Sequence, residues 1–264
     1  ANEGVVCWSD WNGTLAVQNN SEWKDSFVAI KKGDRFQIVN NSVSMMGLKP
    51  YSMNGDPNWE QYVAMHHLLD RDIKCSFLIG GAGSGKTILA LAAGLEQRRQ
   101  FRNILVTRPM VPLEDEDRMG FLPGGVNEKM SPWLKPIFRS LSFIGGVHKD
   151  NEKIIQLVRE KNKLEVEPLD YIRGMTYVKD LLIIDEAQNL TQHQIKTIIT
   201  RAGEGAKIIF TGDLGQIDRM KKINADSSGL AYASVKMVDQ PMVSVVHFKK
   251  TVRSELAHLA ERLL

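Results

Sequence analysis

The chain has 264 residues, enough for one large domain or for one domain with a small accessory module. Hydrophobic residues make up 43% of it and charged residues 25%, which is ordinary for a globular protein and argues against a disordered chain. The net charge of +3 is too small to indicate nucleic-acid binding by itself. The longest apolar runs fall far short of the roughly 20 residues that span a bilayer, so we expect no membrane segment.

Cysteine usage and the N-terminal sequence indicate a cytoplasmic protein. Cys7 and Cys75 lie far apart and outside any metal-binding spacing, so we expect free thiols. The pattern of a secretory signal, charged and then apolar, is not found at the N-terminus. Because the first residue is Ala1 and not Met, we expect the sequence to be a fragment.

Residues 1–50 carry short β-type runs separated by Asn, Gly and Asp. We predict a small β-rich module of unknown role, built as a hairpin or a miniature barrel. Its tryptophans have two alternative roles, base stacking and a place in the module's core, and the core is favoured. A stretch of turn residues at 48–58 marks the predicted boundary with a second domain, residues 51–264.

From residue 59 onward, apolar strands alternate with helices. A helix over residues 59–69 leads to an apolar strand, a glycine-rich loop and a second helix. Thr191 and Gln194 predict a later helix that begins with a capping box and stops at Gly203. The predicted strands are residues 75–80, 103–109, 181–186, 207–213 and 243–248. This alternation predicts an α/β domain whose parallel central sheet is covered by helices on both faces.

The segment GGAGSGKT, Gly80–Thr87, has the spacing of a phosphate-binding loop, or P-loop. Its glycines let the backbone curl so that successive N–H groups point at phosphate oxygens, and the N-terminus of the following helix reinforces them. Lys86 is expected to neutralise the β- and γ-phosphates of ATP, and the Thr87 hydroxyl to bind Mg²⁺. The predicted nucleotide-binding residues of this segment are Gly81, Ala82, Gly83, Ser84, Gly85, Lys86, Thr87 and Ile88.

Asp185 and Glu186 end the apolar run LLII. Standing alone, they would be interpreted as solvated acids at the end of a strand. Beside a P-loop, the strand can deliver Asp185 to Mg²⁺ and Glu186 to the water that attacks the γ-phosphate. Gln188 is expected to sense that water or the γ-phosphate, and Gln216, after the next predicted strand, is a second candidate sensor.

Two further residues complete the candidate site. Gln61 lies on the helix before the P-loop, and its side-chain amide can both donate to and accept from an adenine edge. Arg253 follows the last predicted strand, from where an arginine can reach a γ-phosphate; the alternative is a surface cation. His66 and His67 are interpreted as ordinary helix residues, because no further metal ligands accompany them.

Together these segments resemble the PhoH family of P-loop ATPases, which is related to the first RecA-like domain of superfamily 1 helicases. The chain is most similar to the ATPase half of PIN–PhoH proteins, in which a nuclease domain precedes the PhoH domain, although residues 1–50 do not resemble that nuclease. The segments that carry the resemblance are GGAGSGKTILALAAGLEQ, ILVTRPMVPL, GFLPGGVNEKMSPWLKPI, EVEPLDYIRG, IIDEAQNLTQHQIKTIITRAGEGAKIIFTGDLGQID and RSELAHLAERLL.

The resemblance implies a RecA-like fold and places Gln61 in a Q motif, Gln216 in motif III and Arg253 in motif IV. It also implies that ATP hydrolysis is coupled to the binding or unwinding of single-stranded nucleic acid, with RNA favoured. We expect bases of such a strand to stack on Trp133 or Phe121.

Superfamily 1 helicases hold single strands between two RecA-like domains, and too few residues follow Arg253 to form a second one. We therefore expect a ring-like homo-oligomer, such as a hexamer, with head-to-tail contacts. The arginines that are candidates for reaching the ATP of a neighbouring protomer are Arg108, Arg173, Arg201 and Arg253.

Two other function classes share the P-loop. A regulatory or scaffold module would bind nucleotide without turnover, and the intact set of Lys86, Thr87, Asp185 and Glu186 speaks against it. A small-molecule kinase would transfer the phosphate to an acceptor, whereas the adjacent acids favour activation of water.

Overall fold

The computed structural model describes the chain in nine stretches: residues 5–9, 14–18, 27–32, 35–39, 43–53, 56–109, 126–169, 175–216 and 228–249. The first four are strands of one antiparallel sheet in the order β1-β2-β3-β4, which confirms the expected β-rich segment. Their bounds are Val5–Ser9, Thr14–Gln18, Phe27–Lys32 and Arg35–Val39. The short strands β5 (Ser52–Met53) and β6 (Asp56–Pro57) pair close to the predicted domain boundary, which itself stays a prediction.

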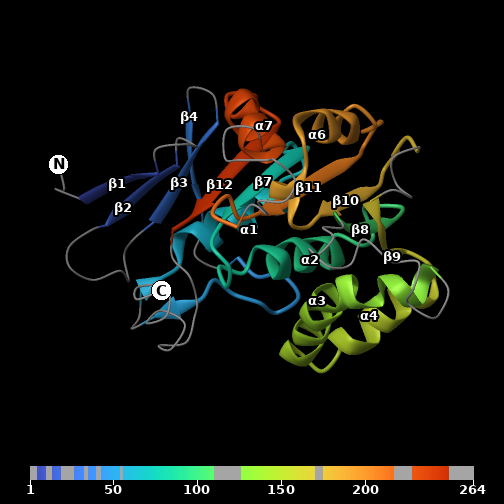
Figure 1. Ribbon diagram of the computed structural model, residues 1–264. Coiled ribbons are helices and arrows are strands. Elements are labelled where there is room, and N and C mark those ends of the chain that lie inside the picture. The colour runs from blue at the N-terminus through green and yellow to red at the C-terminus, as the bar shows by residue number, and fades with distance from the viewer. Residues whose placement is uncertain are drawn as a thin grey trace, which may run out of the picture.

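A six-stranded parallel sheet forms the centre of the second part of the chain, in the order β12-β7-β11-β10-β8-β9 (Figure 1). The five strands predicted from apolar runs are confirmed as β7 (Cys75–Gly80), β8 (Ile104–Arg108), β10 (Leu181–Ile184), β11 (Lys207–Gly212) and β12 (Val243–Phe248). The edge strand β9 (Leu164–Pro168) was not predicted as a strand. The predicted RecA-like α/β architecture is thus confirmed.

Helices cover both faces of this sheet. Alternate strand residues point to opposite sides: Leu78, Val106 and Ile183 pack in one hydrophobic cluster, while Phe77 and Ile184 belong to the other. The first cluster is closed by α1 (Trp59–Leu69), α2 (Lys86–Glu96), α3 (Val126–Val147) and α4 (Asn151–Glu160), and the second by the 3-10 helix η3 (Ala187–Asn189), α6 (Gln192–Ile199) and α7 (Gly229–Met237). Figure 1 shows α2, α3 and α4 on one side of the sheet and α6 and α7 on the other. Each fully buried aliphatic side chain contributes about 1.5–3 kcal/mol to this packing.

The amino ends of two helices are capped by side chains, one of them by the capping box predicted from the sequence. The predicted helix over residues 59–69 is confirmed as α1, and the Asn58 side chain caps it by accepting from the backbone N–H of Gln61. The predicted capping box of α6 is also confirmed, because Thr191 and Gln194 exchange side-chain and backbone hydrogen bonds. The predicted stop at Gly203 is wrong, since α6 ends at Ile199.

Gly203 is required for a different reason. A Cβ at this position would lie 2.7 Å from the backbone oxygen of Tyr177, which accepts a hydrogen bond from the Gly203 N–H at 2.6 Å. The glycine therefore serves a close approach of two backbone segments at the amino end of the sheet. Among the described residues, no helix is long and apolar enough to cross a membrane.

Candidate nucleotide-binding site

The site lies where four neighbouring strands end. The strands β7, β11, β10 and β8 are adjacent and parallel, so the residues that follow them meet at one edge of the sheet. The described residues enclose a cavity of about 230 Å³ at this edge. It is smaller than a typical pocket of about 300–1,000 Å³ for a whole small molecule, so it fits the phosphate end of a nucleotide. Its lining residues are Ala82, Gly83, Gly85, Lys86, Thr87, Ile88, Ser140, Asp185, Glu186, Gly212, Asp213 and Gln216.

Backbone conformation at two glycines shapes the P-loop. Gly83 has a φ of 79° and Gly85 a φ of 90°, values that residues with a Cβ rarely adopt. Gly85 is also the N-cap of α2, and a Cβ there would lie 3.1 Å from the side-chain nitrogen of Gln61. The loop therefore leads directly into the amino end of α2, where free N–H groups and the helix dipole favour an anion.

The Lys86 ammonium donates hydrogen bonds to three acceptors of the P-loop itself. It donates to the backbone oxygens of Gly80 at 2.6 Å and Gly81 at 2.8 Å, and to Ser84 Oγ at 3.1 Å. The side chain is buried. An ammonium group held in this way lies beside the cavity and can exchange these neutral acceptors for a phosphate oxygen, which is a stronger partner because it is charged.

Asp185 is fixed from two sides. One of its carboxylate oxygens, Oδ1, accepts from Thr87 Oγ1 at 2.7 Å and from Thr211 Oγ1 at 2.6 Å. The carboxylate is buried, so the two hydroxyls replace the water that it loses. The predicted pair of Thr87 and Asp185 is therefore brought into contact across the cavity.

The Thr87 hydroxyl and the Asp185 carboxylate are a donor set that fits Mg²⁺. Mg²⁺ prefers oxygen ligands at about 2.0–2.1 Å and takes only one or two of them from the protein, with phosphates and water supplying the rest. Within the described part of the chain, no cluster of three or more His, Cys, Asp or Glu side chains could hold a metal unaided. The Thr87 and Asp185 oxygens can hold the ion together with a phosphate ligand.

Glu186 is held by two side chains of its own chain. Arg108, at the end of β8, lies 3.0 Å from Oε1, and Gln188 Nε2 donates to Oε2 at 2.6 Å. The Glu186 backbone has a φ of 55°, in the left-handed region. The contact with Arg108 could not be predicted from the sequence, because it depends on β8 and β10 being neighbours in the sheet.

Gln188 joins Glu186 to the loop after β11. Its side-chain oxygen accepts from the backbone N–H of Asp213 at 3.1 Å, and its nitrogen lies 3.4 Å from the backbone oxygen of Gln216. Gln216 itself has an exposed side chain that lines the cavity. The two predicted sensors therefore lie together, one buried and one exposed.

Gln61 lies against the outside of the P-loop. Its side-chain oxygen accepts from the backbone N–H of Tyr51 at 2.8 Å, and its nitrogen donates to the backbone oxygen of Ser84 at 3.0 Å. Both ends of the amide are thus bound within the chain, and the contact with adenine stays a prediction. Ser140, on α3, lines the cavity and was missed, because nothing in the sequence distinguishes it from other helix serines.

Several predicted residues lie outside the residues whose side chains the structure describes. These are Arg173, Arg253, Phe121 and Trp133.

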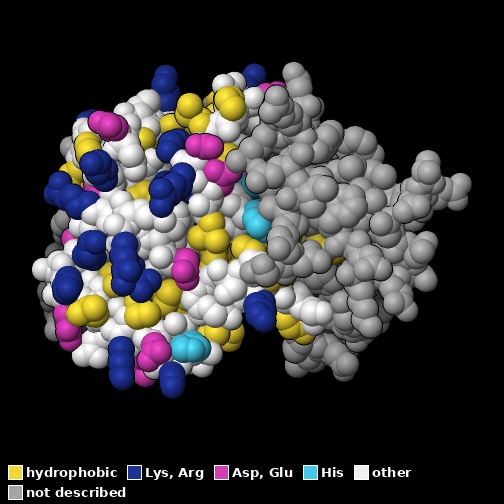
Figure 2. Space-filling model, turned by 180° about the vertical axis from the view of Figure 1, so that it is seen from behind, with side chains coloured by type: hydrophobic (Ala, Val, Ile, Leu, Met, Phe, Trp, Pro, Cys, Tyr) yellow, Lys and Arg dark blue, Asp and Glu magenta, His cyan; other side chains and the backbone are white. Residues whose placement is uncertain are grey.

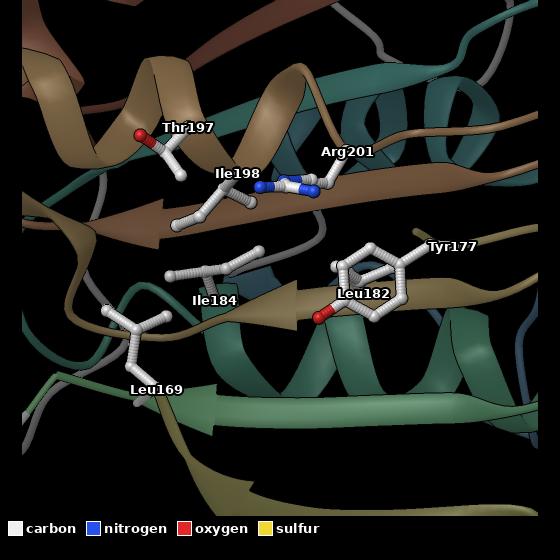
Figure 3. A pocket seen from close by; sticks show the side chains of 7 residues that line it. All are labelled: Leu169, Tyr177, Leu182, Ile184, Thr197, Ile198 and Arg201. Carbon is white, nitrogen blue, oxygen red and sulfur yellow. The ribbon is translucent and has the colours of Figure 1, made fainter. Parts of the chain in front are cut away.

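Arg201 lies at the other end of the sheet from the P-loop. Figure 3 shows it beside Tyr177 and Ile198, above β10. The apolar cavity that these residues line has a volume of about 10 Å³, room for one water at most, so it is no ligand site. Burial raises the pKa of Tyr177 to about 12, which keeps its hydroxyl protonated. Because Arg201 precedes β11 and the P-loop follows β7, the two lie at opposite ends of the parallel sheet, and Arg201 cannot reach the P-loop of its own chain.

Comparison with known protein sequences gives matches over most of the chain. A family model described as PhoH-like protein matches residues 56–264. Protein PhoH2 of Bacillus subtilis is 40% identical over 231 residues, which are 86% of this chain and 50% of that protein. Protein PhoH2 of Mycolicibacterium smegmatis is 32% identical over 238 residues, 89% of this chain and 51% of that protein. The chain thus spans about half the length of these relatives.

Comparison with solved structures gives matches to a helicase and to a terminase. The Pif1 helicase from Candida albicans matches 77% of this chain and 42% of its own, with a TM-score of 0.40 and 17% identity. The large terminase from a thermophilic bacteriophage matches 77% of this chain and 49% of its own, with a TM-score of 0.45 and 10% identity.

Proposed function

We propose that the chain, which belongs to the PhoH family, is a Mg²⁺-dependent ATPase whose turnover is coupled to binding or unwinding of single-stranded nucleic acid, with RNA favoured. The observation that carries the hydrolytic part is the meeting of Lys86, Thr87, Asp185 and Glu186 around one cavity. These residues come from two strand ends far apart in the sequence, and together they supply the charges and oxygens that phosphoryl transfer needs.

In this proposal each side chain has a separate task. The P-loop backbone and Lys86 bind the phosphates, and Glu186 orients a water and accepts its proton. Gln188 and Gln216 report the state of the γ-phosphate to the loop after β11. Mg²⁺, held by Thr87 and Asp185, would neutralise charge on the β- and γ-phosphates when bound.

The coupling to nucleic acid is supported by family membership and by the position of cations. Exposed Lys and Arg side chains gather on the left of Figure 2, away from the residues drawn in grey. A gathering of cations of this kind attracts a polyanion even though the net charge is only +3.

The first test is ATP turnover without any phosphate acceptor. The chain is expected to release inorganic phosphate in the presence of Mg²⁺, and Glu186→Gln is expected to bind ATP but to lose turnover by about 10²-fold or more. Lys86→Ala should lose ATP binding itself. Turnover that needs an added acceptor would indicate a kinase, and binding without turnover a regulatory or scaffold module.

The second test adds single strands. Turnover should increase with single-stranded RNA, and less with DNA of the same length, and binding of the strand should weaken steeply with salt because counterions are released. If neither strand binds or stimulates, the coupling to nucleic acid is wrong, while the ATPase assignment stands.

We further propose that the active form is a ring-like homo-oligomer, such as a hexamer. A head-to-tail ring brings the surface of one protomer to the ATP site of the next. Arg201 suits such a role, since it is exposed and far from its own P-loop.

A further inference from the structure

Glu186 is held by one ion pair and one hydrogen bond within its own chain. Arg108 lies at one carboxylate oxygen, 3.0 Å away, and Gln188 donates to the other at 2.6 Å. A general base must accept a hydrogen bond from the attacking water through one of these oxygens. Both donors therefore compete with that water, and Arg108 competes most strongly because its guanidinium is charged.

We propose that Arg108 is a positioning residue that restrains Glu186 until a phosphate of a bound nucleic-acid strand draws the guanidinium away. This rests on the proposed function, because it gives strand-coupled hydrolysis a physical cause. Guanidinium can bind a phosphate through two N–H groups, whereas Arg108 contacts Glu186 through one nitrogen, so a phosphate can replace the carboxylate as its partner.

The exposure of the pair makes the exchange feasible. The side chains of Arg108 and Glu186 are 23% and 32% exposed, so a strand phosphate can reach the guanidinium from solvent. A partly exposed ion pair contributes little net stability, so its loss does not threaten the fold.

The restraint can be released without disturbing the metal-binding side. Asp185, the residue before Glu186, is held independently by Thr87 and Thr211 and by a backbone hydrogen bond to Thr107 at 2.8 Å. Thr107 precedes Arg108 on β8, and it lies opposite Ile184 in the sheet. Movement of the Arg108 side chain therefore removes the charged partner of Glu186 while Asp185 stays in place.

The test compares Arg108→Met and Arg108→Lys with the wild-type chain, and Arg71→Met serves as the control. Arg71 is an exposed arginine in the turn before β7, at the end of the sheet opposite to Arg108. ATP turnover is measured with and without single-stranded polyuridylate. For Arg108→Met we expect the strand-free kcat to rise about three- to fivefold, the factor that a partly exposed ion pair can supply. The KM for ATP should not change, and polyuridylate should give no further stimulation.

The two other variants sharpen this result. Arg108→Lys keeps the charge but loses the planar fork, so its strand-free kcat should lie between those of the wild type and Arg108→Met. Arg71→Met should keep the wild-type strand-free kcat and the wild-type stimulation ratio. Thermal unfolding of each variant shows that it is folded before its rates are compared.

Strand binding gives a readout that does not depend on turnover. If Arg108 exchanges to a strand phosphate, Arg108→Met should lower the slope of log affinity against log salt for polyuridylate by about one. An unchanged slope together with a raised KM for ATP would assign the phosphate to ATP and overturn the proposal.

Two further outcomes also decide against the restraint. A lower kcat of Arg108→Met with and without polyuridylate would make Arg108 a direct partner of the reacting phosphates. An unchanged strand-free kcat would show that Glu186 is not restrained. If the wild-type chain is not stimulated by any strand, the proposed coupling fails instead, and the strand-free kcat of Arg108→Met still reports on the restraint.

Discussion

Gln188 has a buried side-chain amide whose two ends contact different parts of the site. The nitrogen donates to Glu186, and the oxygen accepts from the backbone N–H of Asp213 after β11. Gly212 leaves room for it, because a Cβ there would lie 2.8 Å from the Gln188 side-chain oxygen. This glutamine therefore links the candidate base to the loop that carries Gln216, as a γ-phosphate sensor would require.

The pair Gln188→Ala and Gln216→Ala separates structural from sensing roles. Gln188→Ala leaves the partly buried Asp213 N–H without its acceptor and removes a buried side chain, so the free energy of unfolding should fall by about 1–3 kcal/mol in urea titrations. Gln216→Ala changes an exposed side chain and should stay within about 0.5 kcal/mol of the wild type. Both should slow ATP turnover. Wild-type turnover in Gln216→Ala would remove this residue from the site.

The sequence predicted the residue types of the site better than their contacts. Lys86, Thr87, Asp185 and Glu186 line one cavity, as the motif spacing indicated. The partner of Glu186 was not foreseen, because a one-dimensional spacing does not tell which strand lies beside β10. The motif gives the residue types of the site, whereas the contacts between strand ends depend on the order of strands in the sheet.

At the scale of elements, hydrogen bonds from Lys207 join β11 to the carboxyl end of α1. Its buried ammonium donates to the backbone oxygens of His67 at 3.3 Å, Leu68 at 2.5 Å and Asp70 at 2.9 Å. The carboxyl end of a helix carries partial negative charge and carbonyls without a partner inside the helix. An ammonium group there is attracted by the charge and donates hydrogen bonds to the carbonyls. Burial is the largest cause that lowers the pKa of Lys207, to about 8.

Lys207 should make stability depend on pH in the alkaline range. Its pKa is 10.5 when unperturbed and about 8 in the fold, so between these values the unfolded chain binds more protons. The free energy of unfolding that Lys207 contributes should therefore rise as pH increases from 8 toward 10.5, and be lowest below pH 8. The difference in unfolding free energy between wild type and Lys207→Met should widen over this range in denaturant titrations.

Lys196→Met, a change of an exposed lysine on α6, is the control for that experiment. Its difference from the wild type should be small and constant with pH. A constant difference for Lys207→Met as well would mean that Lys207 keeps its charge throughout the range.

The elements themselves show where sequence patterns suffice. Continuous apolar runs gave the five strands that are covered on both faces, and the capping box gave the start of α6. The edge strand β9 was missed, because its sequence LEVEP alternates apolar and acidic residues and ends in proline. An edge strand pairs on one side only, so it tolerates proline and needs fewer apolar residues.

At the scale of the whole molecule, the parallel sheet separates two surfaces. The strands end at the candidate nucleotide-binding site, and the turns before them carry Arg201 and other exposed cations. Of the proposed trans-acting arginines that the structure describes, Arg108 pairs with Glu186 in its own chain, which leaves Arg201 as the better candidate. A head-to-tail contact would then complete each ATP site with an arginine from the neighbouring protomer.

Mixing two inactive variants tests this contact directly. Lys86→Ala has an impaired P-loop and an intact Arg201, whereas Arg201→Ala has the reverse, so neither should hydrolyse ATP alone. If Arg201 acts in trans, equal mixtures should regain turnover, up to about a quarter of the wild-type rate when protomers pair at random head to tail. Mixtures of Lys86→Ala with Glu186→Gln, both defective in the same protomer's site, are the control and should stay inactive. Full turnover by Arg201→Ala alone, or by a protein that stays monomeric with ATP and Mg²⁺ in a sizing experiment, would contradict the ring.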